Sequence, residues 1–247
     1  MKMKNNETGF TILELLIATA ILSIILLLVT VVMISIGSLY NKGLSESNTQ
    51  DTARNIVSQI SSQLELSADD ATYGQGTVSN VNVSAYCIGG IRYSFVLNTL
   101  PGENGNTLQH VFWKDVPTGY CNPNFPADLT QSNPSGASAT NGEELISPST
   151  RLTSFCIGSE VTVNATCNNS STLSSPYVVS IGLAFGSADL LCDNNPSPSE
   201  PPANNCNATN LSGENLSNIN GQVTCRGKTG DEYCGTSYLN TVIDSRL

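Results

Sequence analysis

The sequence predicts an α+β fold in which one long N-terminal helix packs against an antiparallel β-sheet and disulfide-linked loops connect the strands. Three features support this prediction. An uncharged apolar run near the start of the chain is long enough for an extended helix. The spacing of apolar residues later changes from a helical period to the period of two that strands show, and eight cysteines follow the apolar run.

The composition argues against nucleic-acid binding. The chain of 247 residues has 10 Lys and Arg against 20 Asp and Glu, a net charge of −10. Its basic residues form no cluster, and an acidic surface repels phosphate groups. We therefore expect no nucleic-acid partner.

The cysteines predict disulfides formed in an oxidising compartment. Their number is even, and no C-x-x-C spacing suggests a redox or zinc site. Spacing does not fix the connectivity, but we expect neighbours in the chain to pair, for example Cys156 with Cys167 and Cys225 with Cys234. The predicted disulfide residues are Cys87, Cys121, Cys156, Cys167, Cys192, Cys206, Cys225 and Cys234.

Residues 10–39 are predicted to form a membrane-spanning helix. The 25 residues from Leu15 to Leu39 carry no charge, and as a helix they rise about 37 Å, more than the hydrocarbon core of about 30 Å. Lys2 and Lys4 precede the run and acidic residues follow it. This asymmetry predicts a single pass through the membrane with the N-terminus in the cytoplasm and the cysteine-containing part outside.

Two simpler interpretations compete for this segment. A secretory signal peptide would be cleaved after the small residues Ala18 and Ala20, but the apolar run continues well beyond them. A plain membrane anchor explains the span but gives no reason for Glu14, since an acid is unfavourable in an apolar helix. In that interpretation Glu14 stays protonated or reaches the nearby interface.

The segment GFTILE, residues 9–14, supplies a third interpretation. With a leader containing two lysines before it and the apolar run after it, it resembles the processing motif of type IV pilins and of the pseudopilins of type II secretion. The resemblance implies that a prepilin peptidase in the membrane cleaves between Gly9 and Phe10. It also implies that the new amine of Phe10 is methylated.

The same resemblance assigns a role to Glu14. Phe10 and Glu14 are four positions apart and therefore share one helical face. In the family the acid pairs with the N-terminal amine of a neighbouring subunit. Phe10 and Glu14 are thus the expected filament-assembly residues, with the carboxylate setting the register of filament entry.

The helix is predicted to continue to about residue 68 as an amphipathic segment beginning near residue 40. Gly37 and Gly43 are weak points where it could bend, and it lacks the proline that interrupts many major pilins. Its predicted apolar face is Ala53, Ile56, Val57, Ile60 and Leu64.

Residues 69–247 are predicted to form a β-rich globular domain. Alternating apolar residues at 91–97, a turn at 101–106 and the segment 108–115 predict a hairpin. Further strands are predicted at 160–165, 177–186 and 237–247.

Two segments of the domain are predicted to be loops, 131–150 and 193–222. The second contains nine Asn and four Pro and lies within a disulfide-rich region, 187–235. Binding functions often reside in loops of this kind. The terminal strands also resemble those of larger minor pilins (the J/W type) and minor pseudopilins.

Catalytic signatures are lacking. The one histidine, His110, falls in the predicted hairpin, and we expect it to be an ordinary strand residue and Trp113 to be a core residue. No metal or cofactor is expected, although three acidic groupings could hold calcium. They are Asp69 with Asp70, Asp189 with Asp193, and Asp231 with Glu232.

The sequence therefore favours a minor type IV pilin over an enzyme. Its leader is residues 1–9, and its expected partners are other pilin subunits, the prepilin peptidase, the inner-membrane assembly platform and, before assembly, the membrane. Three alternatives stay open: a pilin-like adhesin that binds through its loops, a minor pseudopilin, and a membrane-anchored enzyme.

Overall fold

The computed structural model describes residues 11–67, 70–135, 139–158, 172–173, 175–186, 190–193, 223–225 and 231–244. By their contacts the residues divide into two compact units, one ending at Asn41 and the other beginning at Lys42. A single helix, α1 (Ile12–Leu66), contributes to both.

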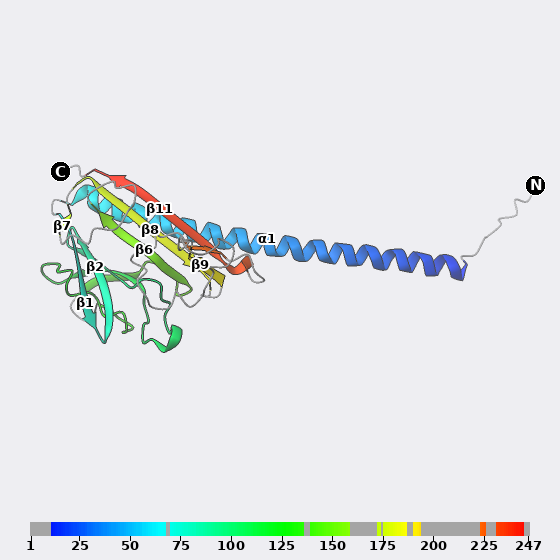
Figure 1. Cartoon of the computed structure of the whole chain (residues 1–247), viewed down its shortest axis with the longest axis horizontal. Coiled ribbons are helices and arrows are strands. Elements are labelled where there is room, and N and C mark those ends of the chain that lie inside the picture. The colour runs from blue at the N-terminus through cyan, green and yellow to red at the C-terminus, as the bar shows by residue number, and fades with distance from the viewer. Residues whose placement is uncertain are drawn as a thin grey trace, which may run out of the picture. The chain divides into compact units, whose positions relative to one another are not determined.

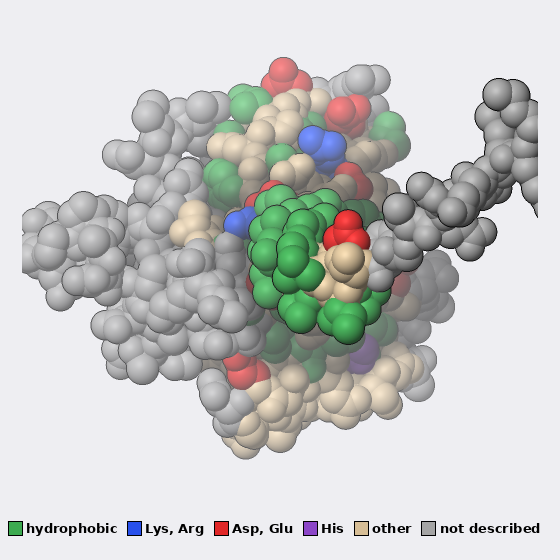
Figure 2. Space-filling view, turned by 90° about the vertical axis from the view of Figure 1, so that its right-hand side faces the viewer, with side chains coloured by type: hydrophobic (Ala, Val, Ile, Leu, Met, Phe, Trp, Pro, Cys, Tyr) green, Lys and Arg blue, Asp and Glu red, His purple; other side chains and the backbone are tan. Residues whose placement is uncertain are grey.

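Helix α1 contains 55 residues and continues through Gly37 and Gly43 without a break. Up to Tyr40 its large apolar side chains are exposed, and Figure 2 shows hydrophobic side chains gathered around this part of the helix. The segment is long and apolar enough to cross a membrane. This agrees with the helix predicted from the uncharged run.

The second half of α1 buries one narrow stripe of side chains. Thr49 and four apolar residues recur at helical spacing, and all are nearly inaccessible to solvent. Val57 is only partly buried against the same core. The apolar residues of the stripe are Ala53, Ile56, Ile60 and Leu64.

An antiparallel sheet of six strands follows the helix, in the order β5-β4-β3-β2-β1-β7. Its strands are β1 (Ala71–Val78), β2 (Val81–Ile88), β3 (Ile91–Phe95), β4 (Phe112–Pro117), β5 (Ala139–Glu144) and β7 (Thr172–Leu173). A 3-10 helix, η1 (Glu103–Gly105), lies in the connection between β3 and β4. The register of β3 and β4 places Arg92 opposite Asp115 and Phe95 opposite Phe112, which confirms the predicted hairpin.

A second sheet has the order β11-β8-β6 and packs beside the second half of α1 (Figure 1). Its strands are β6 (Thr150–Gly158), β8 (Tyr177–Phe185) and β11 (Gly235–Ile243). The remaining elements are the short pair β9 (Leu191–Asp193) and β10 (Val223–Cys225) and the 3-10 helix η6 (Asp231–Tyr233). Strands β8 and β11 confirm two predicted strands.

One hydrophobic core joins the second half of α1 to both sheets. At its centre the ring of Phe155, from β6, makes edge contacts with Tyr86 and Phe95 of the larger sheet, at centroid distances of 5.4 and 5.0 Å. The Tyr86 hydroxyl accepts a hydrogen bond from the Ile157 amide at 3.2 Å. The two sheets are therefore joined by apolar packing and by a satisfied polar contact.

Two disulfides lie wholly within the described residues. Cys225 pairs with Cys234, as predicted, and Cys87 pairs with Cys121. Cys156 is also disulfide-bonded, but its predicted partner, Cys167, lies outside the described residues. Cys206 and the predicted strand at 160–165 lie outside them as well.

Several strands were not predicted. Strand β5 lies in the segment 131–150 that was predicted to be a loop, because β4 supplies an edge to which its polar residues can pair. The hairpin of β1 and β2 was missed because glycines interrupt β1, and β6 because Arg151, Thr153 and Ser154 interrupt its apolar pattern. His110 precedes β4 instead of lying within a strand.

A buried arginine holds the connection between β3 and β4. Arg151 of β6 is 1% exposed, and its guanidinium binds both carboxylate oxygens of Glu103 in η1. It also donates to the Asn98 carbonyl at 3.0 Å. The arginine holds the pKa of Glu103 below the ordinary value of 4.5.

Replacing this arginine is expected to destabilise the fold. Arg151→Met keeps most of the side-chain volume but removes the cation that pairs with Glu103 and the donor of the Asn98 carbonyl, at a loss of about 2–4 kcal/mol in the free energy of unfolding. Urea unfolding of the full chain in detergent, followed by the fluorescence of Trp113, the only tryptophan, measures this. Arg54→Met, at an exposed position of α1, is the control, and equal midpoints for the two variants would contradict the assignment.

The same pair predicts a pH dependence. Because the pKa of Glu103 is lowered on folding, its contribution is present above pH 4.5 and is lost as the pH falls through the pKa of the folded state. The difference in unfolding free energy between the wild type and Arg151→Met should shrink as the pH is lowered below 4.5. A difference that stays constant to pH 3 would show that the ion pair is not its source.

Glycine at position 235 is required by the close approach of β11 to α1. A Cβ added there would lie 2.6 Å from the Ser45 carbonyl oxygen and 2.9 Å from the Glu46 amide nitrogen, both backbone atoms. Gly235→Ala should therefore lower the unfolding free energy by about 1–3 kcal/mol. Gly158→Ala, where a Cβ meets nothing within 4 Å, should leave the urea midpoint nearly unchanged.

Candidate functional site

The first turn of α1 is closed by reciprocal hydrogen bonds between Thr11 and Glu14. The Glu14 carboxylate oxygen Oε2 accepts from the Thr11 amide and from the Thr11 hydroxyl, each at 2.9 Å. In return the Glu14 amide donates to the Thr11 hydroxyl oxygen at 3.3 Å. This is a capping box, in which two backbone amides that would otherwise lack partners at a helix start are satisfied.

The capping box fixes the direction of the carboxylate. Among the described residues only Oε2 is engaged, which leaves Oε1 with lone pairs for a further donor. The side chain is therefore held back toward the N-terminal end of the helix. An anionic group there also interacts favourably with the positive end of the helix dipole.

The surroundings of Glu14 are apolar and open. Its neighbours Ile12, Leu13 and Leu15 are 85, 68 and 61% exposed. A surface of this extent on a single helix marks a segment that is covered by lipid or by other helices. An acid in such a setting needs a cation or other hydrogen-bond donors as partners.

Of the predicted assembly residues, the structure describes only Glu14. Gly9 and Phe10 lie outside the described residues, so cleavage between them and the pairing of Phe10 with Glu14 stay predictions. Thr11 was missed as a partner of Glu14. The signal was present in the sequence, because T-I-L-E before an apolar run has the spacing of a capping box.

The contacts of His110 and Trp113 are those of residues that stabilise the fold. His110 Nδ1 lies 2.9 Å from Glu144 Oε2, and its ring meets the Trp113 ring edge-on at 4.6 Å. Burial raises the pKa of Glu144, against the hydrogen bonds that it accepts from the Phe112 and Val111 amides and from His110. Trp113 is buried in a small apolar cluster, as predicted.

The expectation that the chain binds no metal or cofactor, with calcium as the one alternative, stays a prediction. Among the residues that the structure describes, no three His, Cys, Asp or Glu side chains are grouped so that they could hold a metal ion. Asp69 and Asp189 lie outside those residues.

The comparison with protein families agrees with the N-terminal geometry. Residues 4–30 match the prokaryotic N-terminal methylation motif. No curated protein and no solved structure matches the chain.

The matched segment covers the processing residues, Thr11, Glu14 and the first part of α1. It points to a structural subunit rather than an enzyme and is consistent with membrane anchoring through α1. The chain thus carries the prepilin N-terminus of type IV pilins and pseudopilins, a methylation motif followed by a long apolar helix that packs on antiparallel sheets.

Proposed function

We propose that this chain is a minor type IV pilin, a subunit that is processed at Gly9, enters a pilus and acts near its tip to aid assembly. The observation that carries the proposal is the start of α1, where an oriented carboxylate lies among exposed apolar side chains within the methylation motif. Such a helix has an apolar surface that can pack against other subunits. It also has one polar group that can set the position at which the subunit enters the filament.

The soluble part supports a minor position. Its described residues form two sheets and one further strand pair, β9 with β10, and a domain of this size would crowd a densely repeated shaft. At the tip of a pilus a large domain is tolerated, because no further subunit packs on its outer side. The proposed route runs from the inner membrane, through the prepilin peptidase and the assembly platform, to the extracellular pilus.

The charge of Glu14 is the feature to test. Glu14→Gln keeps an oxygen that can cap the Thr11 amide but removes the charge that would attract the Phe10 amine. We expect Glu14→Gln to be cleaved and methylated normally yet to be reduced at least about tenfold in sheared pili, a loss of about 1.4 kcal/mol in the assembly equilibrium. Mass spectrometry of the mature N-terminus and immunoblots of sheared pili measure both steps.

Glu46→Ala is the matched control, because it removes an exposed acid from the second half of the same helix, and it should enter pili at the wild-type level. Normal incorporation of Glu14→Gln would show that capping, not charge, is what assembly needs. A chain that is not cleaved after Gly9 would overturn the proposal itself. Loss of protein secretion on deletion of the gene, with pili intact, would assign the chain to a secretion pseudopilus.

A further inference from the structure

A small pocket opens on the face of the larger sheet, where the loop 118–135 folds back over β1 to β4. Its volume is about 240 Å³. Two aromatic residues, Tyr120 and Phe125, are among its lining residues, together with the polar residues Arg92, Thr118, Asn122 and Ser135. The pocket is distinct from the start of α1, and nothing in the assembly function uses it.

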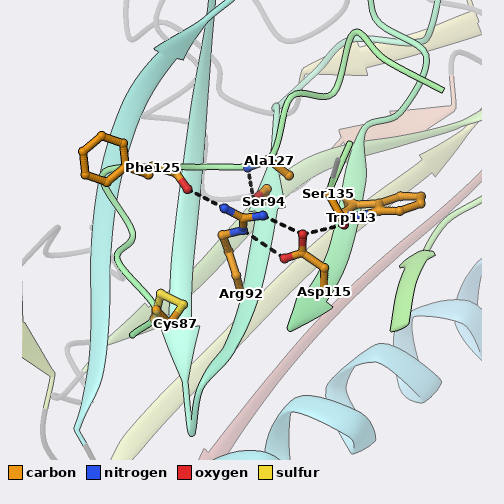
Figure 3. A network of polar contacts seen from close by, with 9 residues as sticks. Cys87, Arg92, Ser94, Trp113, Asp115, Phe125, Ala127 and Ser135 are labelled. Carbon is orange, nitrogen blue, oxygen red and sulfur yellow. Dashed lines mark hydrogen bonds and ion pairs between the residues drawn. A yellow bond between two sulfur atoms is a disulfide. The ribbon is translucent and has the colours of Figure 1, made fainter. Parts of the chain in front are cut away.

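The loop that forms the pocket is held rigidly. The Cys87–Cys121 disulfide ties it to β2, and the Ala127 amide donates to the Ser94 hydroxyl of β3 at 2.9 Å (Figure 3). Gly76 of β1 lets the loop approach closely, because a Cβ there would lie 2.6 Å from Pro126. A rigid pocket loses little conformational entropy when a ligand binds.

The floor of the pocket carries a charge that is already neutralised. Arg92 donates from Nε and Nη2 to the two oxygens of Asp115, at 2.9 and 2.6 Å, and from Nη1 to the Phe125 carbonyl (Figure 3). Asp115 is fully buried and also accepts from the Ser135 hydroxyl, which in turn accepts from Trp113 Nε1. Described residues use three of the five N–H groups of the guanidinium, which leaves two that can serve a ligand.

The rim of the pocket is aromatic and exposed. Tyr120 is 86% exposed and Phe125 is 71% exposed, both unusual for large rings with apolar faces. Figure 3 shows the Phe125 ring pointing away from the Arg92 network while its carbonyl faces Arg92. The rim therefore offers flat apolar surfaces, and the floor offers hydrogen-bond donors and acceptors.

These properties select the chemistry of the ligand. A free anion is disfavoured, because Asp115 neutralises Arg92 and the chain has a net charge of −10. A cation is also disfavoured, because it would lie beside the positively charged guanidinium of Arg92. A purely apolar ligand would leave polar groups of the floor without hydrogen-bond partners. A molecule that combines apolar C–H faces with neutral hydroxyl groups satisfies both the rim and the floor.

We propose that this pocket binds a neutral saccharide, with one sugar ring lying against Tyr120 or Phe125 and its hydroxyl groups hydrogen-bonded to Arg92, Asn122 and Ser135. The site holds about one ring, so a longer glycan would be bound through a single residue. The function would be recognition of a sugar-bearing surface or of a soluble sugar. It is independent of the pilin assignment, since binding needs only the folded soluble part.

The experiment is saturation-transfer difference NMR on the full chain in lauryldimethylamine oxide, a detergent without a sugar head group. The probes are methyl glucoside, methyl galactoside, N-acetylglucosamine and their tetrasaccharides, with glucose 6-phosphate as the anionic comparison. We expect at least one neutral probe to bind with a Kd of about 1 mM or lower. Glucose 6-phosphate should bind about tenfold more weakly than glucoside.

Exposed aromatic residues provide the variants and their control. Tyr120→Ala and Phe125→Ala remove rings that contribute little to the core, and at least one should weaken binding about tenfold. Tyr233→Ala removes an exposed ring outside the pocket and should bind as the wild type does. Unchanged fluorescence of Trp113, whose indole is part of the network below the pocket, verifies the fold.

Each outcome decides the proposal. Binding that depends on Tyr120 or Phe125 supports it, and tighter binding of the tetrasaccharide than of the single sugar indicates a glycan chain as the source. No binding by any probe overturns it, as does binding that neither variant weakens. Stronger binding of glucose 6-phosphate would show that the pocket recognises an anion.

Discussion

The soluble fold depends on one narrow stripe of α1 that both sheets share. Ala53, Ile56, Ile60 and Leu64 contribute to the same core as the aromatic side chains of the larger sheet and the apolar strand β8. Because these four residues are buried and their helical neighbours are exposed or only partly buried, the rotation of α1 about its axis is fixed. The apolar first half belongs to the same continuous helix.

Two arginines, Arg92 and the buried Arg151, organise the connections around this core. Arg92 lies opposite Asp115 across β3 and β4, and Arg151 reaches from β6 to Glu103. In each case the guanidinium also donates to a backbone carbonyl of a loop, Phe125 or Asn98. Long connections have many backbone groups that need hydrogen-bond partners. Here a single guanidinium binds a carboxylate and also donates to a backbone carbonyl of a loop. The carboxylate of Asp115, which is fully buried, would be unfavourable without its arginine.

Elements with a strong periodic pattern of apolar residues could be predicted from the sequence. Strands that form only because a neighbouring strand pairs with them could not. Helix α1, the β3–β4 hairpin, β8 and β11 follow from periodicity. Strand β5 contains Gly142 and consecutive acids, and only the adjacent edge of β4 makes it a strand. For the pocket, Arg92 and Asp115 are more than twenty residues apart in the chain, and their contact depends on a register that no local pattern specifies.

At the start of α1 the role of Glu14 in assembly stays a prediction, and its local environment was predicted only in part. Glu14 was singled out because an acid in an apolar run is unfavourable, and the partner considered was the Phe10 amine. The structure adds Thr11, which binds Oε2 and leaves Oε1 available. Capping and ion pairing need not compete, since a carboxylate can accept several hydrogen bonds at once. A side chain already held by its own helix loses less entropy when it meets a cation, so the cap favours the proposed contact of Glu14 with the Phe10 amine.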